Sequence, residues 1–272
     1  MVINKEKKIK FNLSPSSLNT YFQSPLLFYL KYIAKVPDDT KVPVCYGLSG
    51  NIVHNCLEKY SKKQISRDEA YMLLMSEWQE KNLHYHPDIK NQPLNSQDYL
   101  SALIKGLQIV DQHENHVCEE TIQFPALSND KMEIGVKGII DLQATEKSTG
   151  ENVIIDYKTS NSVSQGKEFE RQALFYNYLV HKKKNILPTK TVFHYLKLNI
   201  PKTYNFSEIQ VKSFEKEIYS VSEKILEYGT DIGSYPIGNI EDLFNSKKRA
   251  CEEELQRRMG FSNIRKFVQM RF

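Results

Sequence analysis

Apolar and polar residues follow two different periods along this chain, and the changes of period divide it into three parts. From Ser14 to about residue 116 the apolar residues recur every three or four positions, as they do on one face of a helix. Between residues 119 and 199 they form short runs typical of strands, with one helical segment among them. After residue 207 the helical period returns. The pattern predicts helices, then a mixed α/β core, then helices again.

Local signals place the ends of several helices. Ser14-Pro15 supplies an N-cap and a first-turn proline, so a helix is expected to begin there. Pro25 starts or bends a second helix that runs through Tyr32, while the lysine-rich stretch 1–12 is expected to be frayed at its start. Further helices are predicted at about 46–62, 67–82, 96–116, 165–182 and 207–228, with a polar connection around 84–93 and a basic helix after a break at 229–238.

The predicted strands lie near residues 119–126, 132–145, 151–158 and 190–199. The second and third are separated by the turn-like Ser148-Thr149-Gly150, so we expect them to form a β-hairpin. A helix separates the third strand from the fourth, which indicates a crossover connection and therefore a mixed sheet. The fold class expected is α/β, with a central mixed β-sheet flanked by helices.

Composition sets bounds on the class of protein. The 272 residues, 40% of them hydrophobic, suffice for one large domain or for one domain with a helical elaboration. No apolar stretch approaches the length that spans a bilayer, and no signal-peptide pattern opens the chain, so no membrane partner is expected. The cysteines show no disulfide framework, so a reducing, cytoplasmic (intracellular) setting is expected. The net charge of +4 is too weak to indicate nucleic-acid binding by itself.

The chemistry is concentrated in two segments at the predicted hairpin. Gly138-Ile139-Ile140-Asp141 and Ile154-Ile155-Asp156-Tyr157-Lys158-Thr159 are apolar runs that end in acid. Two carboxylates suit magnesium or manganese, and Lys158 shares a sheet face with Asp156 because side chains alternate along a strand. This arrangement fits phosphodiester hydrolysis. Acids and a lysine at strand ends are also common on solvated surfaces, so these residues alone leave both interpretations open.

Taken together, the motifs resemble those of the PD-(D/E)XK nuclease superfamily and, more narrowly, of its branch related to the RecB nuclease domain. Asp141 followed by Asp156-Tyr157-Lys158 is similar to the family signature. The segment from Gly50 through His54 to Glu58 resembles an upstream helix of that branch, and Gln172 to Tyr176 resembles its Gln-x-x-x-Tyr motif. The segments Leu13-Ser14-Pro15-Ser16-Ser17-Leu18 and Tyr21 through Tyr29 resemble its opening helices.

The resemblance implies a restriction-endonuclease-like core with an N-terminal helical insertion and C-terminal helices. The whole chain, residues 1–272, would form a single nuclease domain. Its parts would be a mainly helical stretch at 13–117, a catalytic α/β core at 118–200, and a helical, basic stretch at 201–272.

The resemblance also implies a metal site. Asp141 and Asp156 would bind Mg²⁺ or Mn²⁺ directly, aided by the backbone carbonyl of Tyr157, and His54 would be an additional ligand. A third acid is expected from the strand before Asp141, where Glu119 and Glu120 face opposite ways. Glu120 is slightly favoured.

Three polar side chains would complete the catalytic group. Lys158 would position the attacking water or stabilise charge on the phosphate oxygens. Gln172 and Tyr176 lie four residues apart, so one helical face presents both, and the family gives them roles in positioning Lys158 and the DNA backbone. The alternative for Tyr176 is packing in a core ridge with Phe169 and Phe175.

A basic C-terminal stretch is the second candidate for DNA contact. From Lys247 to Phe272 eight basic residues stand against three glutamates, a charge of +5. A solvated helix with Glu–Arg pairs explains the same residues. Aromatic side chains between Tyr21 and Tyr29 could line a single-strand channel, although core packing accounts for most of them. The predicted DNA contacts are Arg171, Tyr176, Lys247, Lys248, Arg249, Arg257 and Arg258.

The cysteines depart from some relatives. Certain members, including CRISPR adaptation nucleases, hold an iron–sulfur cluster whose first cysteine would fall near Ser24. The four cysteines here are widely scattered, at positions 45, 56, 118 and 251, whereas cluster ligands usually include closely spaced cysteines. No iron–sulfur cluster is expected.

The function predicted is a metal-dependent deoxyribonuclease, an exonuclease acting on single strands or DNA ends. The alternatives are an endonuclease that cuts flaps or branched DNA, and a non-catalytic nucleic-acid-binding module that retains the fold. RNA remains open as a substrate. No Gly-x-x-x-x-Gly-Lys-Ser/Thr loop is present, so any unwinding requires a partner such as a helicase or recombination protein. The Lys- and Asn-rich composition suggests an AT-rich genome, such as that of a virus.

Overall fold

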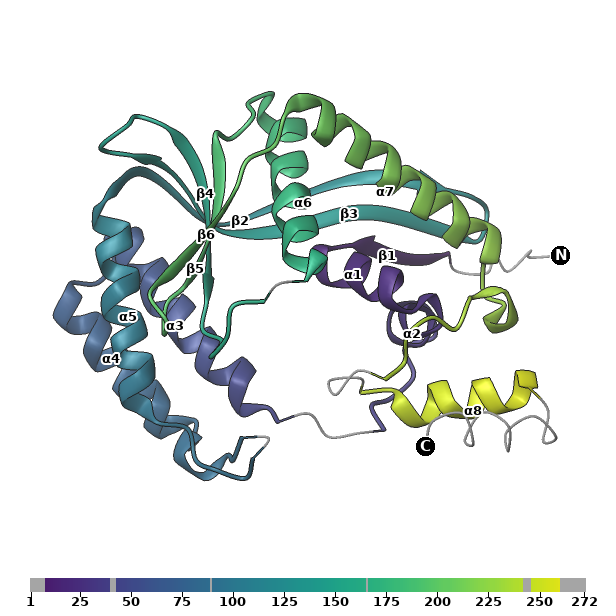
Figure 1. Cartoon of the computed structure of the whole chain (residues 1–272), viewed down its shortest axis with the longest axis horizontal. Coiled ribbons are helices and arrows are strands. Elements are labelled where there is room, and N and C mark those ends of the chain that lie inside the picture. Colours follow the sequence, from purple (N-terminus) through teal and green to yellow (C-terminus); the bar gives the residue numbers. More distant parts are fainter. Residues whose placement is uncertain (1–7, 40–42, 89, 165, 242–245, 260–272) are drawn as a thin grey trace, which may run out of the picture. The chain divides into compact units, whose positions relative to one another are not determined.

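The computed structural model describes residues 8–39, 43–88, 90–164, 166–241 and 246–259. Within these ranges the chain forms eight α-helices and a six-stranded sheet (Figure 1). The helices are α1 (Pro15–Gln23), α2 (Pro25–Phe28), α3 (Cys45–Ser61), α4 (Arg67–Glu80), α5 (Ser96–Asp111), α6 (Lys167–Lys184), α7 (Glu208–Tyr228) and α8 (Lys248–Met259). The strands are β1 (Ile9–Leu13), β2 (His113–Ser128), β3 (Met132–Glu146), β4 (Asn152–Lys158), β5 (Lys190–Tyr195) and β6 (Ile200–Tyr204). None of the helices in the described ranges combines the length and hydropathy needed to cross a bilayer.

The strand order confirms the mixed α/β sheet. Strands run in the order β1-β3-β4-β5-β6, and β2 pairs with β3. The expected hairpin is present, since β3 and β4 are antiparallel with Leu142 opposite Ile155. Strand β5 is parallel to β4, with Phe193 opposite Asp156, and α6 makes the crossover between them. A restriction-endonuclease-like core with flanking helices is therefore what the chain forms.

The chain divides into two compact units. The terminal unit contains Met1–Val42, Phe124–Val136 and Ile218–Phe272, and the central unit contains Pro43–Gln123 and Lys137–Glu217. Both long strands of the β2–β3 pair contribute residues to each unit.

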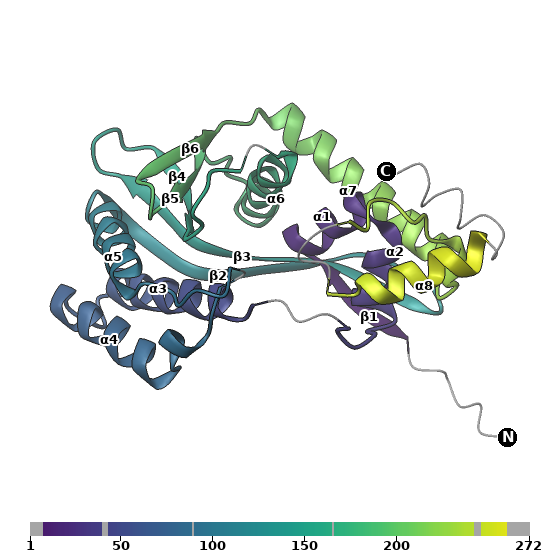
Figure 2. The ribbon, with the colours of Figure 1, turned by 60° about the horizontal axis from the view of Figure 1, so that its bottom comes forward.

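In the central unit the sheet carries helices on both faces (Figure 2). Helices α3, α4 and α5 pack on one face through a core that includes Trp78, Leu103 and Ile155. Helix α6 lies on the other face, where its Asn177 donates to Thr191 of β5 at 2.7 Å. A Cβ at Gly138 would lie 2.4 Å from a methyl carbon of Leu179, so a glycine here lets α6 approach β3 closely.

In the terminal unit, the N-terminal helices are held to a C-terminal segment by a clasp of hydrogen bonds. Gly238 lies at its centre with φ +66°, and a Cβ there would be 2.5 Å from the carbonyl oxygen of Gln23. The side chains of Leu26, Ile240 and Cys251 form an apolar cluster beside it. The clasp bonds run from Ser24 Oγ to the Ile237 carbonyl, from Asn239 N to the Gln23 carbonyl (2.8 Å) and from Leu26 N to the Pro236 carbonyl (2.9 Å).

Three elements differ from the sequence expectation. Residues 9–13, where no strand was predicted, form β1, because they pair in parallel with residues 132–136 of β3. The last predicted strand is shorter, and the chain turns after Tyr195 to return as β6. Helix α5 ends at Asp111 rather than near residue 116, because β2 begins at His113.

Candidate active site

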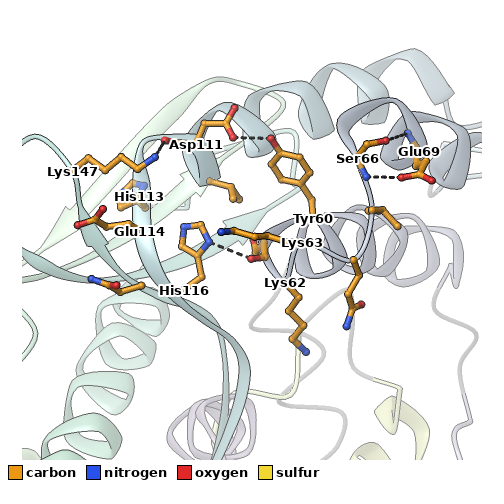
Figure 3. Close-up of a pocket in the computed structure, with 15 residues that line it drawn as sticks. Tyr60, Lys62, Lys63, Ser66, Glu69, Asp111, His113, Glu114, His116 and Lys147 are labelled. Atoms are coloured by element: carbon orange, nitrogen blue, oxygen red, sulfur yellow. Dashed lines mark hydrogen bonds between the residues drawn. The ribbon is translucent and has the colours of Figure 1, made fainter.

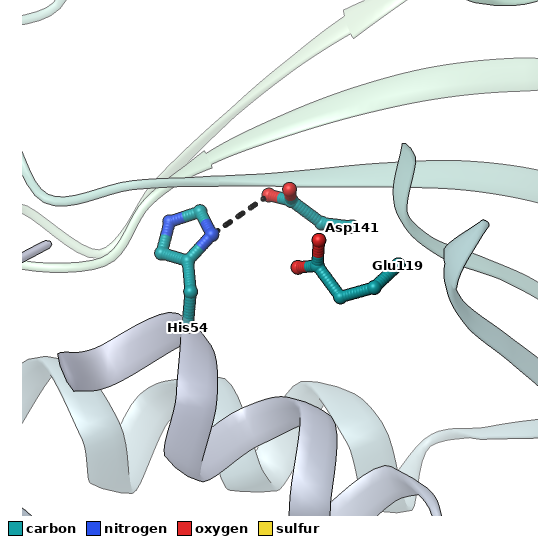
Figure 4. Close-up of side chains that lie close together, drawn as sticks. All are labelled: His54, Glu119 and Asp141. Atoms are coloured by element: carbon teal, nitrogen blue, oxygen red, sulfur yellow. Dashed lines mark ion pairs between the residues drawn. The ribbon is translucent and has the colours of Figure 1, made fainter. Parts of the chain in front are cut away.

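Three side chains from three elements meet in the central unit. His54 of α3, Glu119 of β2 and Asp141 of β3 each offer one ligand atom, and these atoms all lie within 4.8 Å of one another (Figure 4). All three residues are partly buried. The sequence places them 22 to 87 residues apart, and the packing of α3 on the sheet brings His54 to the two acids.

His54 links two predicted metal ligands. Its Nδ1 lies 3.4 Å from Asp141 Oδ2, and its Nε2 lies 2.9 Å from the carbonyl oxygen of Tyr157. Burial favours the neutral imidazole, but the charge of Asp141 outweighs it and raises the pKa of His54 to about 9. The protonated ring can donate from both nitrogens, to Asp141 and to the Tyr157 carbonyl. A bound metal ion would take the place of one of these protons between the ring and its oxygen partner. Asp141 also accepts from the backbone N–H of Tyr157 at 2.8 Å.

The acid from β2 in this cluster is Glu119, whereas sequence reasoning slightly favoured Glu120. Glu119 has φ +52°, a left-handed conformation that interrupts the regular alternation of the strand. Burial and the nearby Asp141 raise its pKa to about 7.

Glu120 points to a different set of partners. Its carboxylate pairs with Lys183 at 2.8 Å and Lys184 at 2.9 Å, both on α6, and accepts from Gln143. Burial opposes ionisation, but these three donors together hold its pKa at about 2. Glu120 therefore lies in an ion-pair network rather than with His54 and Asp141.

The other predicted catalytic residues form a second, connected group. Asp156 Oδ1 accepts from Gln172 Nε2 and from the Tyr176 hydroxyl, each at 3.1 Å. Gln172 Nε2 also donates to the Tyr176 hydroxyl at 2.7 Å, and its Oε1 accepts from Lys158 Nζ at 3.2 Å. Lys158 Nζ lies 2.7 Å from Asp156 Oδ2 as an ion pair. One face of α6 thus orients both Asp156 and Lys158, as the four-residue spacing predicted.

Two aromatic rings that sequence reasoning did not assign to the site lie beneath Lys158. Its Nζ is 5.0 Å from the ring centre of Phe169 and 4.8 Å from that of Phe193. The faces of these rings attract the positively charged ammonium group and limit the conformations that the Lys158 side chain can adopt. The position of Phe169, one helical turn before Gln172, was a signal that could have revealed this contact. Burial raises the pKa of Asp156, against the opposing charge of Lys158.

The predicted basic contacts are largely engaged within the protein. Lys247 is buried and bonded to Asp38. Arg249 pairs with Glu253 along α8, and two further arginines bond Glu254. These contacts favour the alternative of a helix stabilised by its own ion pairs. Lys248 lies in α8 and Arg171 in α6, and both are partly buried. The two arginines that bond Glu254 are Arg257 and Arg258. The remaining basic residues of this stretch lie outside the described residues: Arg265, Lys266 and Arg271.

Cysteines make no cluster in the part of the chain that the structure describes. The His54–Glu119–Asp141 group is the candidate metal-binding group found there, and it contains no cysteine. Three of the four cysteines are buried at separate places. Ser24, at the position of the first cluster cysteine in some relatives, belongs to the clasp.

A polar pocket of about 1010 Å³ opens near the end of α3 (Figure 3). The pocket is lined by equal numbers of lysines and acids, so its charge gives no preference for an anion. The lysines are at positions 62, 63 and 147, and the acids at 69, 111 and 114. None of the three metal-ligand candidates lines this pocket, although the charge of its Lys62 lowers the pKa of Glu119 against the larger effect of burial.

The donor set of the cluster fits a divalent cation. The carboxylates are oxygen donors of the kind that magnesium and manganese take, and the imidazole adds one nitrogen donor. Glu119 and Asp141 would supply oxygen and His54 nitrogen, with the Tyr157 carbonyl already directed at the imidazole.

Comparisons with known proteins bear on the family and on the fold. A family model described as the PD-(D/E)XK nuclease superfamily matches residues 12–259. The crystal structure of a "putative exonuclease" from Eubacterium rectale aligns with a TM-score of 0.53 at 9% identity, covering 89% of this chain and 87% of that one. The structure of SSO0001 aligns at a TM-score of 0.38 and 13% identity, over 87% of this chain and 96% of that one. A search of curated protein sequences gave no match.

Proposed function

Because the chain belongs to the PD-(D/E)XK nuclease superfamily, we propose that it is a metal-dependent deoxyribonuclease of the RecB-related branch, an exonuclease on single-stranded DNA or DNA ends. The observation that carries this proposal is the convergence of His54, Glu119 and Asp141, whose ligand atoms lie within 4.8 Å of one another. The proposed setting is the cytoplasm, with a helicase or recombination protein as the partner that supplies unwound DNA.

The metal-binding group in this proposal is His54, Glu119, Asp141 and the Tyr157 carbonyl, with Asp156 beside it. The proposed cation is Mg²⁺ or Mn²⁺, because most of the donors are oxygen atoms. When bound, the cation would polarise the scissile phosphate and lower the pKa of a bound water. Glu119 takes the place that sequence reasoning gave to Glu120, because only Glu119 belongs to the group.

Besides the proposed metal ion, the site contains a positively charged side chain, that of Lys158. Its ammonium is held by Asp156 at 2.7 Å and by Gln172 at 3.2 Å, over two aromatic rings. In this position it can hold a water or a phosphate oxygen by hydrogen bonding and offset growing negative charge. Tyr176 keeps Asp156 fixed, so that Asp156 and Lys158 act as one oriented pair.

The Eubacterium rectale protein, described as a "putative exonuclease", shares the fold at 9% identity, and the exonuclease assignment itself is proposed from the resemblance of the motifs to the RecB-related branch. An endonuclease that cuts flaps or branches would use the same residues with a different DNA path. The two are distinguished by whether a free end is required.

The test is cleavage of matched linear and circular single-stranded DNA in Mn²⁺, Mg²⁺ or EDTA. The variant Asp156→Asn keeps the size of the side chain and removes its charge, and Lys158→Gln replaces the ammonium group by a neutral amide on a shorter side chain. We expect the protein to degrade the linear strand and to leave the circle intact. EDTA and each of the two substitutions should abolish this cleavage. Cleavage of the circle would favour the endonuclease, and cleavage of neither by the folded wild-type protein would refute the nuclease proposal.

Adjacent glutamates provide a matched control for the metal site. Glu119→Gln removes a charged ligand from the cluster, so we expect the Mn²⁺ concentration for half-maximal cleavage to rise at least tenfold, an order-of-magnitude estimate for a lost metal contact. Glu120→Gln removes the same charge one residue away, where the carboxylate bonds Lys183 and Lys184. It should lower the thermal midpoint and leave the Mn²⁺ requirement unchanged. An equal Mn²⁺ dependence for both variants would contradict the assignment of Glu119.

A further inference from the structure

An exposed apolar side chain lies in β3 directly before the candidate metal group. Ile139 is 45% exposed, while Ile140 beside it is fully buried. Lys137 and Asp141, two residues away on either side, are partly exposed, and Gly138 is buried. The exposure therefore alternates from 137 to 141, which places Lys137, Ile139 and Asp141 on one face of the strand.

That face is opposite α6. Gly138 is the residue that faces α6, since a Cβ there would meet Leu179 and Phe175. Its neighbours in the strand must point away from that helix. Asp141 points to His54 of α3 and to Glu119. Lys137 and Ile139 thus continue the face of the metal group along β3.

Lys137 brings an uncompensated positive charge to this face. Within the described ranges no carboxylate lies within ion-pair distance of its amine, in contrast to the lysines on α6, which hold Glu120. The strip of Lys137 and Ile139 therefore offers one apolar and one cationic side chain beside the acids. We call these two residues the β3 strip.

We propose that the β3 strip binds the nucleotide next to the scissile phosphate, with its base against Ile139 and its phosphate at Lys137. The inference rests on the proposed function, because it takes the metal group as the point of cleavage. It narrows the substrate to DNA that is single-stranded where it crosses β3.

The apolar side chain in the strip explains this preference. Bases in a duplex are paired and stacked about 3.4 Å apart along each strand, so their faces are covered by neighbouring bases. An unstacked base exposes an apolar face that Ile139 can cover. Paired bases in a duplex cannot present that face.

The experiment compares two short strands that carry the same phosphates. One is a ten-nucleotide oligo-dT, and the other is a ten-residue abasic strand. Binding is measured by fluorescence anisotropy with Mn²⁺ and in the Asp156→Asn background, so that cleavage does not consume the strand. The variants are Ile139→Ala and Lys137→Gln. Matched controls are Ile186→Ala, which is similarly exposed at 48% after α6, and Lys216→Gln on the exposed face of α7.

The two substitutions should have different signatures. Ile139→Ala should weaken binding of oligo-dT about fivefold and leave the abasic strand unchanged, since it removes a base contact at the low end of the stacking range. Lys137→Gln should weaken both strands and reduce the slope of log affinity against log salt by about 0.7, as expected for one phosphate of a single strand. The controls should bind like the parent protein.

Several results would overturn the inference. An equal effect of Ile139→Ala on the two strands would show that no base touches this side chain. An unchanged slope of log affinity against log salt in Lys137→Gln would show that this lysine contacts no phosphate. If the folded protein bound neither strand, the whole proposal for the β3 strip would be refuted. Cleavage by the wild-type protein in Mn²⁺ is scored separately, so a failure of the proposed activity is distinguishable from a failure of the strip.

Discussion

Replacing Gly238 by alanine should destabilise the protein far more than the same change at Gly229. Both glycines lie in the terminal unit with a left-handed backbone, at φ +66° and +57°. They differ in their surroundings. A Cβ at Gly229 would have no atom within 4 Å, whereas one at Gly238 would lie 2.5 Å from the Gln23 carbonyl oxygen and 2.6 Å from the Cα of Ser24.

The magnitude follows from these contacts. An L-residue in the left-handed region costs about 1 kcal/mol, which both variants share. At Gly238 the crowding atoms belong to the backbone and cannot rotate away, so the two segments of the clasp must separate. That separation breaks the bond from Asn239 N to the Gln23 carbonyl and the bond from Ser24 Oγ to the Ile237 carbonyl. At about 1 kcal/mol for each bond, Gly238→Ala should lose about 3 kcal/mol of unfolding free energy and Gly229→Ala about 1 kcal/mol.

Urea titration followed by far-ultraviolet circular dichroism measures this difference. The urea concentration at the midpoint should fall in both variants, with the larger fall at Gly238. The slope of unfolding free energy against urea concentration should be the same in both if their unfolded states are alike. Equal losses in the two variants would refute the reasoning, because backbone strain alone would then account for both. No loss at Gly238 would show that the clasp can open without cost.

Three further predictions concern the site and its support. Tyr176→Phe removes the hydroxyl that bonds Asp156 at 3.1 Å, so kcat should fall at least tenfold with little change in KM, measured by steady-state cleavage; an unchanged kcat would contradict the positioning role. Gly138→Ala would press α6 away from β3 and should lower the thermal midpoint and kcat together, unlike Gly47→Ala, where no atom lies within 4 Å. Hydrogen bonds from arginines hold the pKa of Glu254 at about 2, below its usual 4.5, so its stabilisation is present above pH 4.5 and is lost as pH falls toward 2. The difference in unfolding free energy between wild type and Glu254→Gln should be about 1 kcal/mol at pH 7, allowing for solvent-exposed partners, and should shrink between pH 4.5 and 2; a difference independent of pH would contradict the ion pairs.

Local sequence signals were sufficient for most of the fold. The Ser14-Pro15 pair caps α1 as expected, because a serine hydroxyl and a first-turn proline act within four residues. The β3–β4 hairpin followed from two apolar runs around a turn containing Gly150, which adopts φ +72°. The order of the motifs also identified the family and the α/β class. These features depend on neighbours in the sequence, which is why they could be read from it.

Non-local pairing explains the elements that were missed. Residues 9–13 become a strand only because β3, more than 100 residues later, offers them a parallel partner. Strand β6 contains Pro201, which argues against a central strand, and it forms at the edge of the sheet after a left-handed Asn199.

The site shows the same division. The helical spacing of Gln172 and Tyr176 correctly predicted that both reach one place, and the structure joins them at Asp156. The choice between Glu119 and Glu120 could not be made from alternation. It depends on a left-handed residue inside β2, a conformation that glutamate seldom adopts and that no local pattern indicated.

The division of the chain into two units has a consequence for the order in which the protein folds during synthesis. The central unit is complete once residue 217 has been made, and it contains every residue of the proposed metal group. The terminal unit joins three separate stretches, so its N-terminal helices must wait about 200 residues for the segment that closes the clasp. Contacts of such long range form slowly. We therefore expect nascent chains arrested after the central unit to resist proteolysis there, while residues 8–39 remain sensitive until α8 has been made.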